Sequence, residues 1–191
     1  LGLSATLQFT AVAQVDTCRD GIKLDTSEAA NSLECGDNAD ARDEGTTALG
    51  DASHAEGPYA VAISYRAFAN GDSSMAIGSS AGATGDRSVA IGRYSAIGGS
   101  GSNVFGHTAR ALGNNSIAIG DQSVVGDLVN FALADSSVAV GAQANINDSL
   151  SAAFGAFSTV RGSRSIAIGA NALVGIDSDS TLSVDGSVAL G

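Results

Sequence analysis

The sequence is poor in the large side chains that usually fill a protein core. It contains no tryptophan and one proline, and only three tyrosines and six phenylalanines among 191 residues. Its apolar residues are mostly alanine, valine and isoleucine, so each buried side chain contributes little at roughly 25 cal/mol per Å². Burial must therefore come from many regular, close contacts between small groups.

Basic residues are also scarce. Nine lysines and arginines stand against 20 aspartates and glutamates, which gives a formal net charge of −11. Binding to nucleic acid through phosphates needs clustered positive charge, so we expect no nucleic-acid partner. The same balance disfavours an anionic membrane surface, and an acidic surface is expected to keep the protein soluble.

No stretch approaches the roughly 18 apolar residues of a membrane span. We therefore expect no direct membrane insertion by this fragment, and any membrane anchor to lie outside this sequence. Residues 1–13 are mildly apolar, and Ala11-Val12-Ala13 fits the small-x-small cleavage rule. This pattern predicts a signal-peptide remnant at 1–13 followed by an N-terminal segment at 14–30, with an N-terminal strand as the alternative.

Cysteine and histidine occur only twice each. In an exported chain, Cys18 and Cys35 are expected to form one disulfide, and two sulfurs without a nearby histidine cannot make a four-ligand zinc site. His54 and His107 have no partner at metal or catalytic-triad spacing. We therefore predict no catalytic residue, no metal and no cofactor, and a protein that is not an enzyme.

A short motif of the form Ser-x-Ala-x-Gly recurs along the chain. Its closing position falls at fourteen-residue steps at Gly36, Gly50, Ser64, Gly78, Gly92, Gly106 and Gly120, and again at Gly141, Gly155 and Gly169. The steps to Gly141 and Gly191 are longer, at 21 and 22 residues. So strict a period predicts a stacked repeat over 31–191, with insertions near 124–135 and 176–185.

Each repeat contains two strand-sized pieces separated by Gly, Asp and Asn. A helix with a glycine at every seventh position would lose about 1 kcal/mol at each one, whereas short β-branched runs between glycines fit strands. Two strands in 14 residues predict a flattened β-roll. About eleven coils at about 4.8 Å each would give a rod on the order of 50 Å long.

The two strands differ in their outer faces. In the second strand, two alanines face inward and a variable residue faces out, as in Ala67-Phe68-Ala69. The first strand is apolar on both sides, as in Ile117-Ala118-Ile119, and such strands are normally buried on both faces. One face can fill the narrow interior, and the other needs a second chain. The sequence predicts an obligate homo-oligomer and leaves open which face is interior. The residues assigned to this trimer or core packing are Ile77, Ile91, Ile119, Val140 and Ile168.

The stretch Asn115 to Ser123, "NSIAIGDQS", carries a resemblance to a known family. It is similar to the Asn-Ser-Val-Ala-Ile-Gly-x-x-Ser motif of the YadA-like head of trimeric autotransporter adhesins, with Ile117 in place of Val. The resemblance implies an all-β, left-handed parallel β-roll (solenoid) of 14-residue coils that assembles as a homotrimer. It also implies export to the bacterial cell surface and outer membrane, and a role in virulence.

By the same resemblance, the head would attach to host extracellular matrix through collagen-type ligands, to host cells or to other bacteria. The repeat motif then supplies the candidate ligand-binding residues. These are Asn115, Ser116, Ile117, Ala118, Ile119, Gly120 and Ser123. The two cysteines and the two insertions depart from the family pattern, and the neck, stalk and membrane barrel of the family are outside this sequence.

Two alternatives remain. The chain could be a structural spacer of a surface fibre. It could be a calcium-dependent repeat protein, because residues 98–106 are similar to a calcium nonapeptide with Asn103 in the Asp slot, and residues 34–44 are acidic. Ice binding would need a flat row of threonines, which the outward positions do not form.

Overall fold

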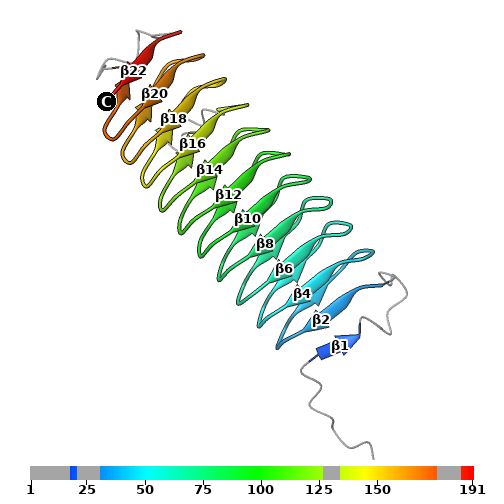
Figure 1. Ribbon diagram of the computed structural model, residues 1–191. Coiled ribbons are helices and arrows are strands. Elements are labelled where there is room, and N and C mark those ends of the chain that lie inside the picture. Colours follow the sequence, from blue (N-terminus) through cyan, green and yellow to red (C-terminus); the bar gives the residue numbers. More distant parts are fainter. Residues whose placement is uncertain (1–17, 21–30, 127–133, 176–185) are drawn as a thin grey trace, which may run out of the picture.

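The protein is a rod of stacked coils, each made of two short strands and two tight turns (Figure 1). The computed structural model describes residues 18–20, 31–126, 134–175 and 186–191. The predicted signal remnant at 1–13 lies outside the described residues, as does nearly all of the 14–30 segment. Within them there is no helix, and hence none long and apolar enough to cross a membrane.

The larger sheet collects the first strand of every coil. Over the described residues it has twelve strands in the order β1 (Cys18–Asp20), β2 (Leu33–Cys35), β4 (Thr47–Leu49), β6 (Val61–Ile63), β8 (Met75–Ile77), β10 (Val89–Ile91), β12 (Asn103–Phe105), β14 (Ile117–Ile119), β16 (Val138–Val140), β18 (Ala152–Phe154), β20 (Ile166–Ile168) and β22 (Val188–Leu190). All neighbours pair in parallel except β1, which runs antiparallel to β2.

The smaller sheet collects the second strand of every coil. In the described part of the chain it has ten strands, namely β3 (Asp40–Ala41), β5 (His54–Ala55), β7 (Phe68–Ala69), β9 (Gly82–Ala83), β11 (Ala96–Ile97), β13 (Arg110–Ala111), β15 (Val124–Val125), β17 (Asn145–Ile146), β19 (Thr159–Val160) and β21 (Leu173–Val174). They pair in parallel in sequence order.

The register carries each residue onto its counterpart in the next coil. Ala90 pairs with Ala76 on one side and Val104 on the other, fourteen residues away in each direction. The longer steps do not disturb this register, because β14 pairs directly with β16 and β20 with β22. The predicted all-β roll of about fourteen-residue coils is confirmed as a parallel solenoid.

The structure reduces the range of residues that the insertion expected near 124–135 can occupy. Val124 and Val125 form β15, an ordinary member of the smaller sheet between β13 and β17. Asp135 is again in a regular turn, where its side chain accepts a hydrogen bond from the backbone of Asn114. The extra residues of this coil therefore fall within 127–133, outside the described residues, as do those expected at 176–185.

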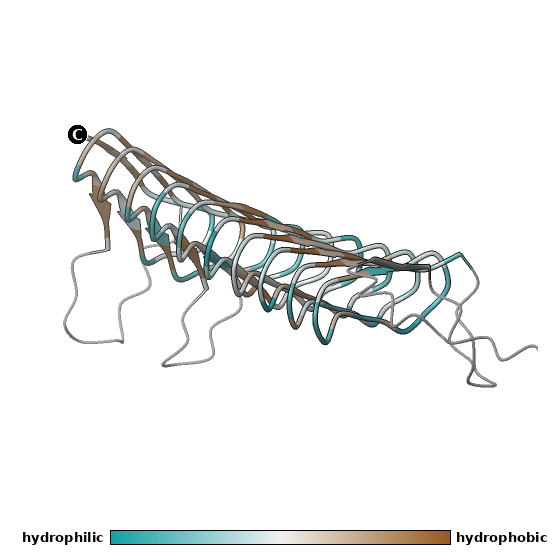
Figure 2. Cartoon of the chain, turned by 90° about the horizontal axis from the view of Figure 1, so that it is seen from below, coloured by the Kyte–Doolittle hydropathy of each residue, from teal (hydrophilic) through white to brown (hydrophobic). Residues whose placement is uncertain are grey.

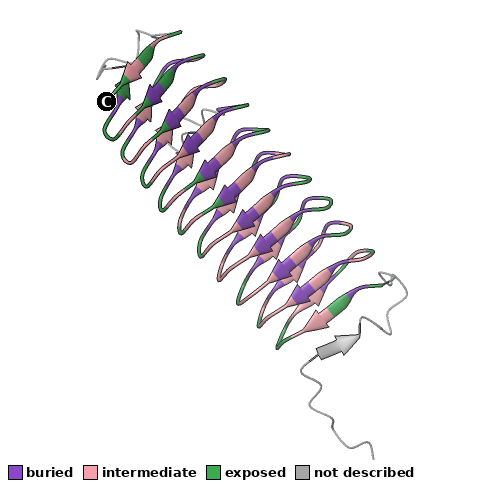
Figure 3. Ribbon diagram, viewed as in Figure 1, coloured by how far each residue is buried: buried purple, intermediate pink, exposed green. Residues whose placement is uncertain are grey.

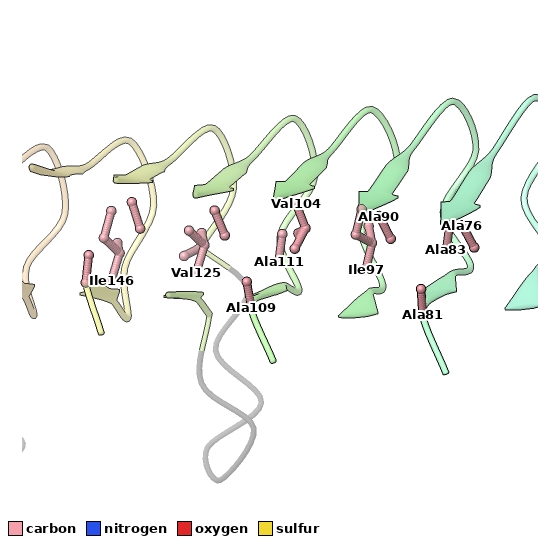
Figure 4. Close-up of a cluster of buried hydrophobic side chains, with 14 of the residues drawn as sticks. Ala76, Ala81, Ala83, Ala90, Ile97, Val104, Ala109, Ala111, Val125 and Ile146 are labelled. Carbon is pink, nitrogen blue, oxygen red and sulfur yellow. The ribbon is translucent and has the colours of Figure 1, made fainter. Parts of the chain in front are cut away.

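The core is a double column of small side chains between the two sheets. Ala76, Ala90 and Val104 of the larger sheet face Ala83, Ile97 and Ala111 of the smaller sheet (Figure 4), and all six are almost fully buried. Figure 3 shows the same alternation along the rod, with one buried residue at the centre of each larger-sheet strand from β4 to β20. The sheets lie so close together that the larger sheet contributes mainly alanine.

The core side chains of the smaller sheet become larger along the chain. Its inward positions are alanine in β3, β5, β7 and β9, whereas most later strands carry Val or Ile. The larger residues are Ile97, Val125, Ile146, Val160 and Val174. The coils toward the C-terminal end therefore bury more apolar area each, at roughly 25 cal/mol per Å².

The turns after the larger-sheet strands stack backbone on backbone. In the turn Gly120–Ser123, the amide of Ser123 donates to the carbonyl of Gly120 at 3.3 Å, and Gln122 has φ +56°. A positive φ at the third turn residue is the geometry of a type II turn. The closing glycine itself is extended at positive φ, with Gly92 at +132°, a region that residues with a Cβ rarely occupy.

Ser64 occupies a closing position that is otherwise glycine in the described coils, and it has φ +104°. A side chain in this region costs on the order of 1–3 kcal/mol. We expect Ser64→Gly to raise the free energy of unfolding by about 1 kcal/mol, because the relieved strain exceeds the extra entropy of the unfolded chain. Urea unfolding would measure it. Ser79→Gly, at a position without positive φ, is the control and should be neutral or destabilising; equal midpoints for the two variants would contradict the prediction.

Candidate functional site

The outward side of the larger sheet is an apolar face. We use this name for the side chains at the first and third positions of its strands from β4 to β22. They are mainly Val, Ile, Leu, Met and Phe. Figure 2 shows hydrophobic residues running along the sheets, while hydrophilic residues gather in the turns. A folded monomer rarely leaves so continuous an apolar strip exposed, so this face marks an interaction surface.

The structure decides which face of the first strand is interior. Ala118 is fully buried in the roll, whereas its neighbour Ile119 remains 38% exposed on the apolar face. The five residues predicted for trimer or core packing all take the outer position and none is in the core. These residues are Ile77, Ile91, Ile119, Val140 and Ile168. The space between the sheets admits alanine here, so the larger side chain must point outward.

The motif Asn115 to Ser123 is a structural unit rather than a continuous surface. Ser116, Ala118 and Ser123 are fully buried, so their assignment as ligand-binding residues is corrected: they cannot contact a ligand directly. Asn115 is exposed in a turn at φ +52°. Ile117 and Gly120 are half-buried, and Ile119 belongs to the apolar face.

The buried serines of this motif form a hydrogen-bonded ladder along the rod. The hydroxyl of Ser137 accepts from the amide of Ser151 at 3.1 Å and donates to the carbonyl of Asp148 at 3.1 Å. The amides of four further serines donate to the preceding serine hydroxyl in the same way, at 3.0–3.3 Å; they are Ser116, Ser137, Ser165 and Ser187. The serine therefore satisfies backbone groups where two coils meet, which explains its recurrence.

We expect Ser137→Ala to lower the free energy of unfolding by about 1–3 kcal/mol, because the buried amide of Ser151 loses its acceptor. Ser95→Ala is the matched control. Ser95 is equally buried, but its hydroxyl donates only to Gly92 within its own turn, and alanine stands at the equivalent Ala81 and Ala109. Chemical unfolding of both variants would measure the difference in unfolding free energy. Equal losses of stability in the two variants would rule out a special role for the ladder.

The two rows of turns differ in chemistry. We call the turns that follow the larger-sheet strands the Tyr65 edge. Its central pairs include Tyr65-Arg66, Arg93-Tyr94 and His107-Thr108, which are exposed apart from the half-buried Thr108. The opposite row, the Asp72 edge, is built on carboxylates and amides. There the amide of Asp72 donates to the side chain of Asp86 at 3.1 Å. On the Tyr65 edge, the guanidinium carbons of Arg66 and Arg93 lie 5.1 Å from the ring centres of Tyr65 and Tyr94.

His107 has partners that its sequence neighbours do not reveal. Its Nε2 lies 3.0 Å from Nη2 of Arg93 and its Nδ1 lies 2.8 Å from Oδ1 of Asp121, in the coils on either side. Arginine can only donate, so Nε2 accepts and the proton sits on Nδ1, which donates to Asp121. Spacing along the sequence did not reveal these two partners, because residues fourteen apart in the chain are adjacent in this fold.

These contacts have a modest electrostatic consequence. The hydrogen bond from His107, followed by one from Gln122, lowers the pKa of Asp121 below its ordinary value of 3.8. A carboxyl group whose pKa is lower in the folded than in the unfolded protein stabilises the fold above its unfolded pKa. This stabilisation is lost as the pH falls through the folded pKa. The contribution is therefore present at neutral pH and is lost as the pH falls below the ordinary value of the carboxyl pKa.

The regions considered for calcium are already occupied by internal contacts. Asn103 lies in β12, paired between Val89 and Ile117, and not in a loop. In the acidic stretch, Glu34 accepts from the amide of Ala41 and Asp40 pairs with Arg42 at 2.6 Å. Within the described ranges, no group of three or more His, Cys, Asp or Glu side chains is placed to hold a metal ion.

Cys18 and Cys35 are register partners in the first strand pair. Cys35 is disulfide-bonded, and the register of β1 with β2 places Cys18 opposite it. The chain contains no other cysteine. We expect alkylation under denaturing, non-reducing conditions to label no thiol, and two thiols after reduction. Labelling without reductant would contradict the Cys18–Cys35 bond.

A comparison with protein families gives the origin of this architecture. The model described as "YadA head domain repeat (2 copies)" matches residues 44–63, 69–95, 98–123 and 150–172, just over half of the chain. The chain belongs to the YadA head family. The interval between the last two matches contains 127–133, where the fourteen-residue step is interrupted. A comparison with curated proteins found no match.

Membership of the YadA head family indicates an adhesin-type, surface-exposed function rather than an enzymatic one. For a YadA-like head, the surfaces that can meet another molecule are the apolar face, the outward side of the smaller sheet and the two edges. The Tyr65 edge was missed from the sequence because its residues look unrelated in linear order. The fourteen-residue spacing of Arg93, His107 and Asp121 is the signal that could have found it.

Proposed function

We propose that this chain is the head of a homotrimeric adhesin on the bacterial surface, in which left-handed rolls pack through their apolar faces. The observation that carries the proposal is the exposed apolar strip on the larger sheet, where Phe105, Ile119, Phe154 and Ile168 are each more than a third exposed. The resemblance to trimeric autotransporter heads favours a cyclic trimer over a face-to-face dimer.

The size of the apolar face supports an obligate contact. Ten strands at about 4.8 Å give a strip about 43 Å long, and two columns of side chains make it several hundred Å² in area. Strands that are apolar on both sides are stable when both sides are covered. Association of three identical faces provides that cover along the whole rod.

The remaining outer surface would carry adhesion. It consists of the smaller sheet and the two edges, which offer varied polar, charged and aromatic groups to host extracellular matrix, including collagen-type ligands, to host cells or to other bacteria. Each coil would supply a weak contact. Three chains in one head would multiply such contacts through avidity.

Two measurements test the proposal in order. Light scattering of the 191-residue chain should give three times its 18.7 kDa mass. A stable monomer would overturn the trimer. The trimer should then bind at least one surface from a panel coated with collagen, laminin, fibronectin or host cells. A stable trimer that binds none of them would favour the spacer function over adhesion.

A further inference from the structure

The Tyr65 edge carries positive charge on an otherwise acidic protein. Residues 31–56 contain seven carboxylates and one arginine, a formal charge of −6. Along the Tyr65 edge from Tyr65 to Thr108, the turn residues include Arg66 and Arg93 and no carboxylate. Asp51 and Asp121 stand in the turns on either side of this stretch. The part of the edge from Tyr65 to Thr108 is therefore a basic segment about four coils long, with an aspartate in the turn beyond each end.

The guanidinium groups of Arg66 and Arg93 are fixed in position by neighbouring side chains but are not paired with a carboxylate in the part of the chain that the structure describes. Among the residues that the structure describes, no carboxylate lies within ion-pair distance of either guanidinium. Arg66 lies over the ring of Tyr65 and Arg93 over that of Tyr94, and Arg93 is also fixed by His107. Stacking on a ring leaves in-plane N–H groups for an anion, and preorganisation reduces the entropy lost on binding.

The backbone of this edge is not available to a peptide strand. The amide of Ser80 donates to Tyr65, that of Tyr94 to Ser79, and that of Thr108 to Arg93, at 2.9–3.0 Å. Each such bond joins one coil to the next, so these amides are already used. Recognition must therefore come from side chains alone, which excludes strand addition and favours a ligand with its own repeated polar groups.

We propose that the Tyr65 edge binds an anionic oligosaccharide, with sulfate or carboxylate groups on Arg66 and Arg93 and sugar rings on Tyr65 and Tyr94. The turns that carry the two arginines are two coils apart, about 9.6 Å along the rod, which is close to the length of one disaccharide unit. Ser79 and Ser80 lie between them, and their hydroxyls can both donate to and accept from sugar hydroxyls.

This inference rests on the proposed adhesion function and names a ligand class for it. Asp51 and Asp121 would repel a polyanion that extended further, so the footprint is about a tetrasaccharide per chain. A sulfated or uronic acid chain could come from host glycosaminoglycan or from a bacterial polysaccharide. The chemistry is shared, and the two sources differ in whether sulfate or only carboxylate is present.

The test is calorimetric titration of the full chain with a heparin-derived tetrasaccharide, a size-matched polyuronate tetrasaccharide and a neutral tetrasaccharide. We expect binding of one or both anionic probes and none of the neutral one. Arg66→Gln combined with Arg93→Gln should weaken binding at least about tenfold through loss of two charge-assisted contacts. Arg87→Gln with Arg164→Gln removes the same charge from exposed positions on the Asp72 edge and should change affinity less than about threefold.

The variant Tyr94→Leu distinguishes binding of an anionic sugar from binding of an acidic peptide. It removes the aromatic platform while keeping the charge, so it should weaken the tetrasaccharide and leave any weak binding of a polyglutamate peptide unchanged. The proposal would be overturned if the Arg66/Arg93 and Arg87/Arg164 double variants lost affinity equally. Tighter binding of polyglutamate than of either anionic sugar would also overturn it. Matrix-protein binding is scored separately, so a trimer that binds collagen but no anionic sugar refutes only this inference.

Discussion

Gly92→Ala should destabilise the protein by more than about 4 kcal/mol, which places it among the rare severe single substitutions. Two effects add at this position. Glycine has φ +132° here, and a Cβ would lie 2.2 Å from the carbonyl oxygen of Gly106 in the next coil. The new Cβ and the carbonyl oxygen are both held by backbone and cannot move away as a flexible side chain would. The two coils must therefore separate, or the turn must change its conformation.

The consequence would spread beyond the site. In a solenoid, each repeat is stabilised mainly by its neighbours, and the loss of one interface divides the stack. For a chain of this length, 1 kcal/mol corresponds to about 2–4 °C in Tm, so we expect a fall of about 10 °C or more. Thermal and urea unfolding of the wild type and the variant measure this loss of stability. A variant that does not fold at all would be the most severe form of the same effect.

Gly82→Ala is the control that separates backbone stacking from the loss of any glycine. Gly82 lies in β9 at the outward position, and a Cβ there would meet nothing within 4 Å. The substitution should be neutral or should stabilise by about 0.4–1 kcal/mol through the unfolded state. If Gly92→Ala and Gly82→Ala were equally stable, the coils would not be in the close backbone contact described here.

The second large effect is expected at the apolar face. Ile119→Asp combined with Ile168→Asp should dissociate the proposed trimer, because each substitution buries unpaired carboxylates where three chains meet. A buried charge without a partner costs about 3–5 kcal/mol, so the dissociation constant should rise by well over a hundredfold. Light scattering across a concentration series would detect the monomer.

The matched control uses the smaller sheet of the same two coils. Val124→Asp combined with Leu173→Asp changes the charge equally, and Leu173 is 43% exposed compared with 46% for Ile168. These residues point outward from β15 and β21, away from the apolar face. The control should remain a trimer. Dissociation of the control and not of the first variant would place the interface on the opposite sheet.

The sequence determined the repeat because its physical cause is local. Glycine recurs where the turns require positive φ or where coils touch, and serine recurs where two coils share a hydrogen bond, as at Gly92 and Ser137. Short β-branched runs between such positions leave little choice but strands. The all-β roll, its period and the inward alanines of the second strand therefore followed from residue types and spacing.

The orientation of the first strand could not be predicted, since Ile117, Ala118 and Ile119 are apolar on both faces. Only the narrow space between the two sheets places the alanine of this strand inside and leaves its two isoleucines on the apolar face. The same limit applies to the Tyr65 edge. Arg93, His107 and Asp121 meet because stacking converts fourteen residues of sequence into one strand spacing of about 4.8 Å. Residue types thus set the coil, while sheet separation and stacking decided which side chains are buried and which meet at the surface.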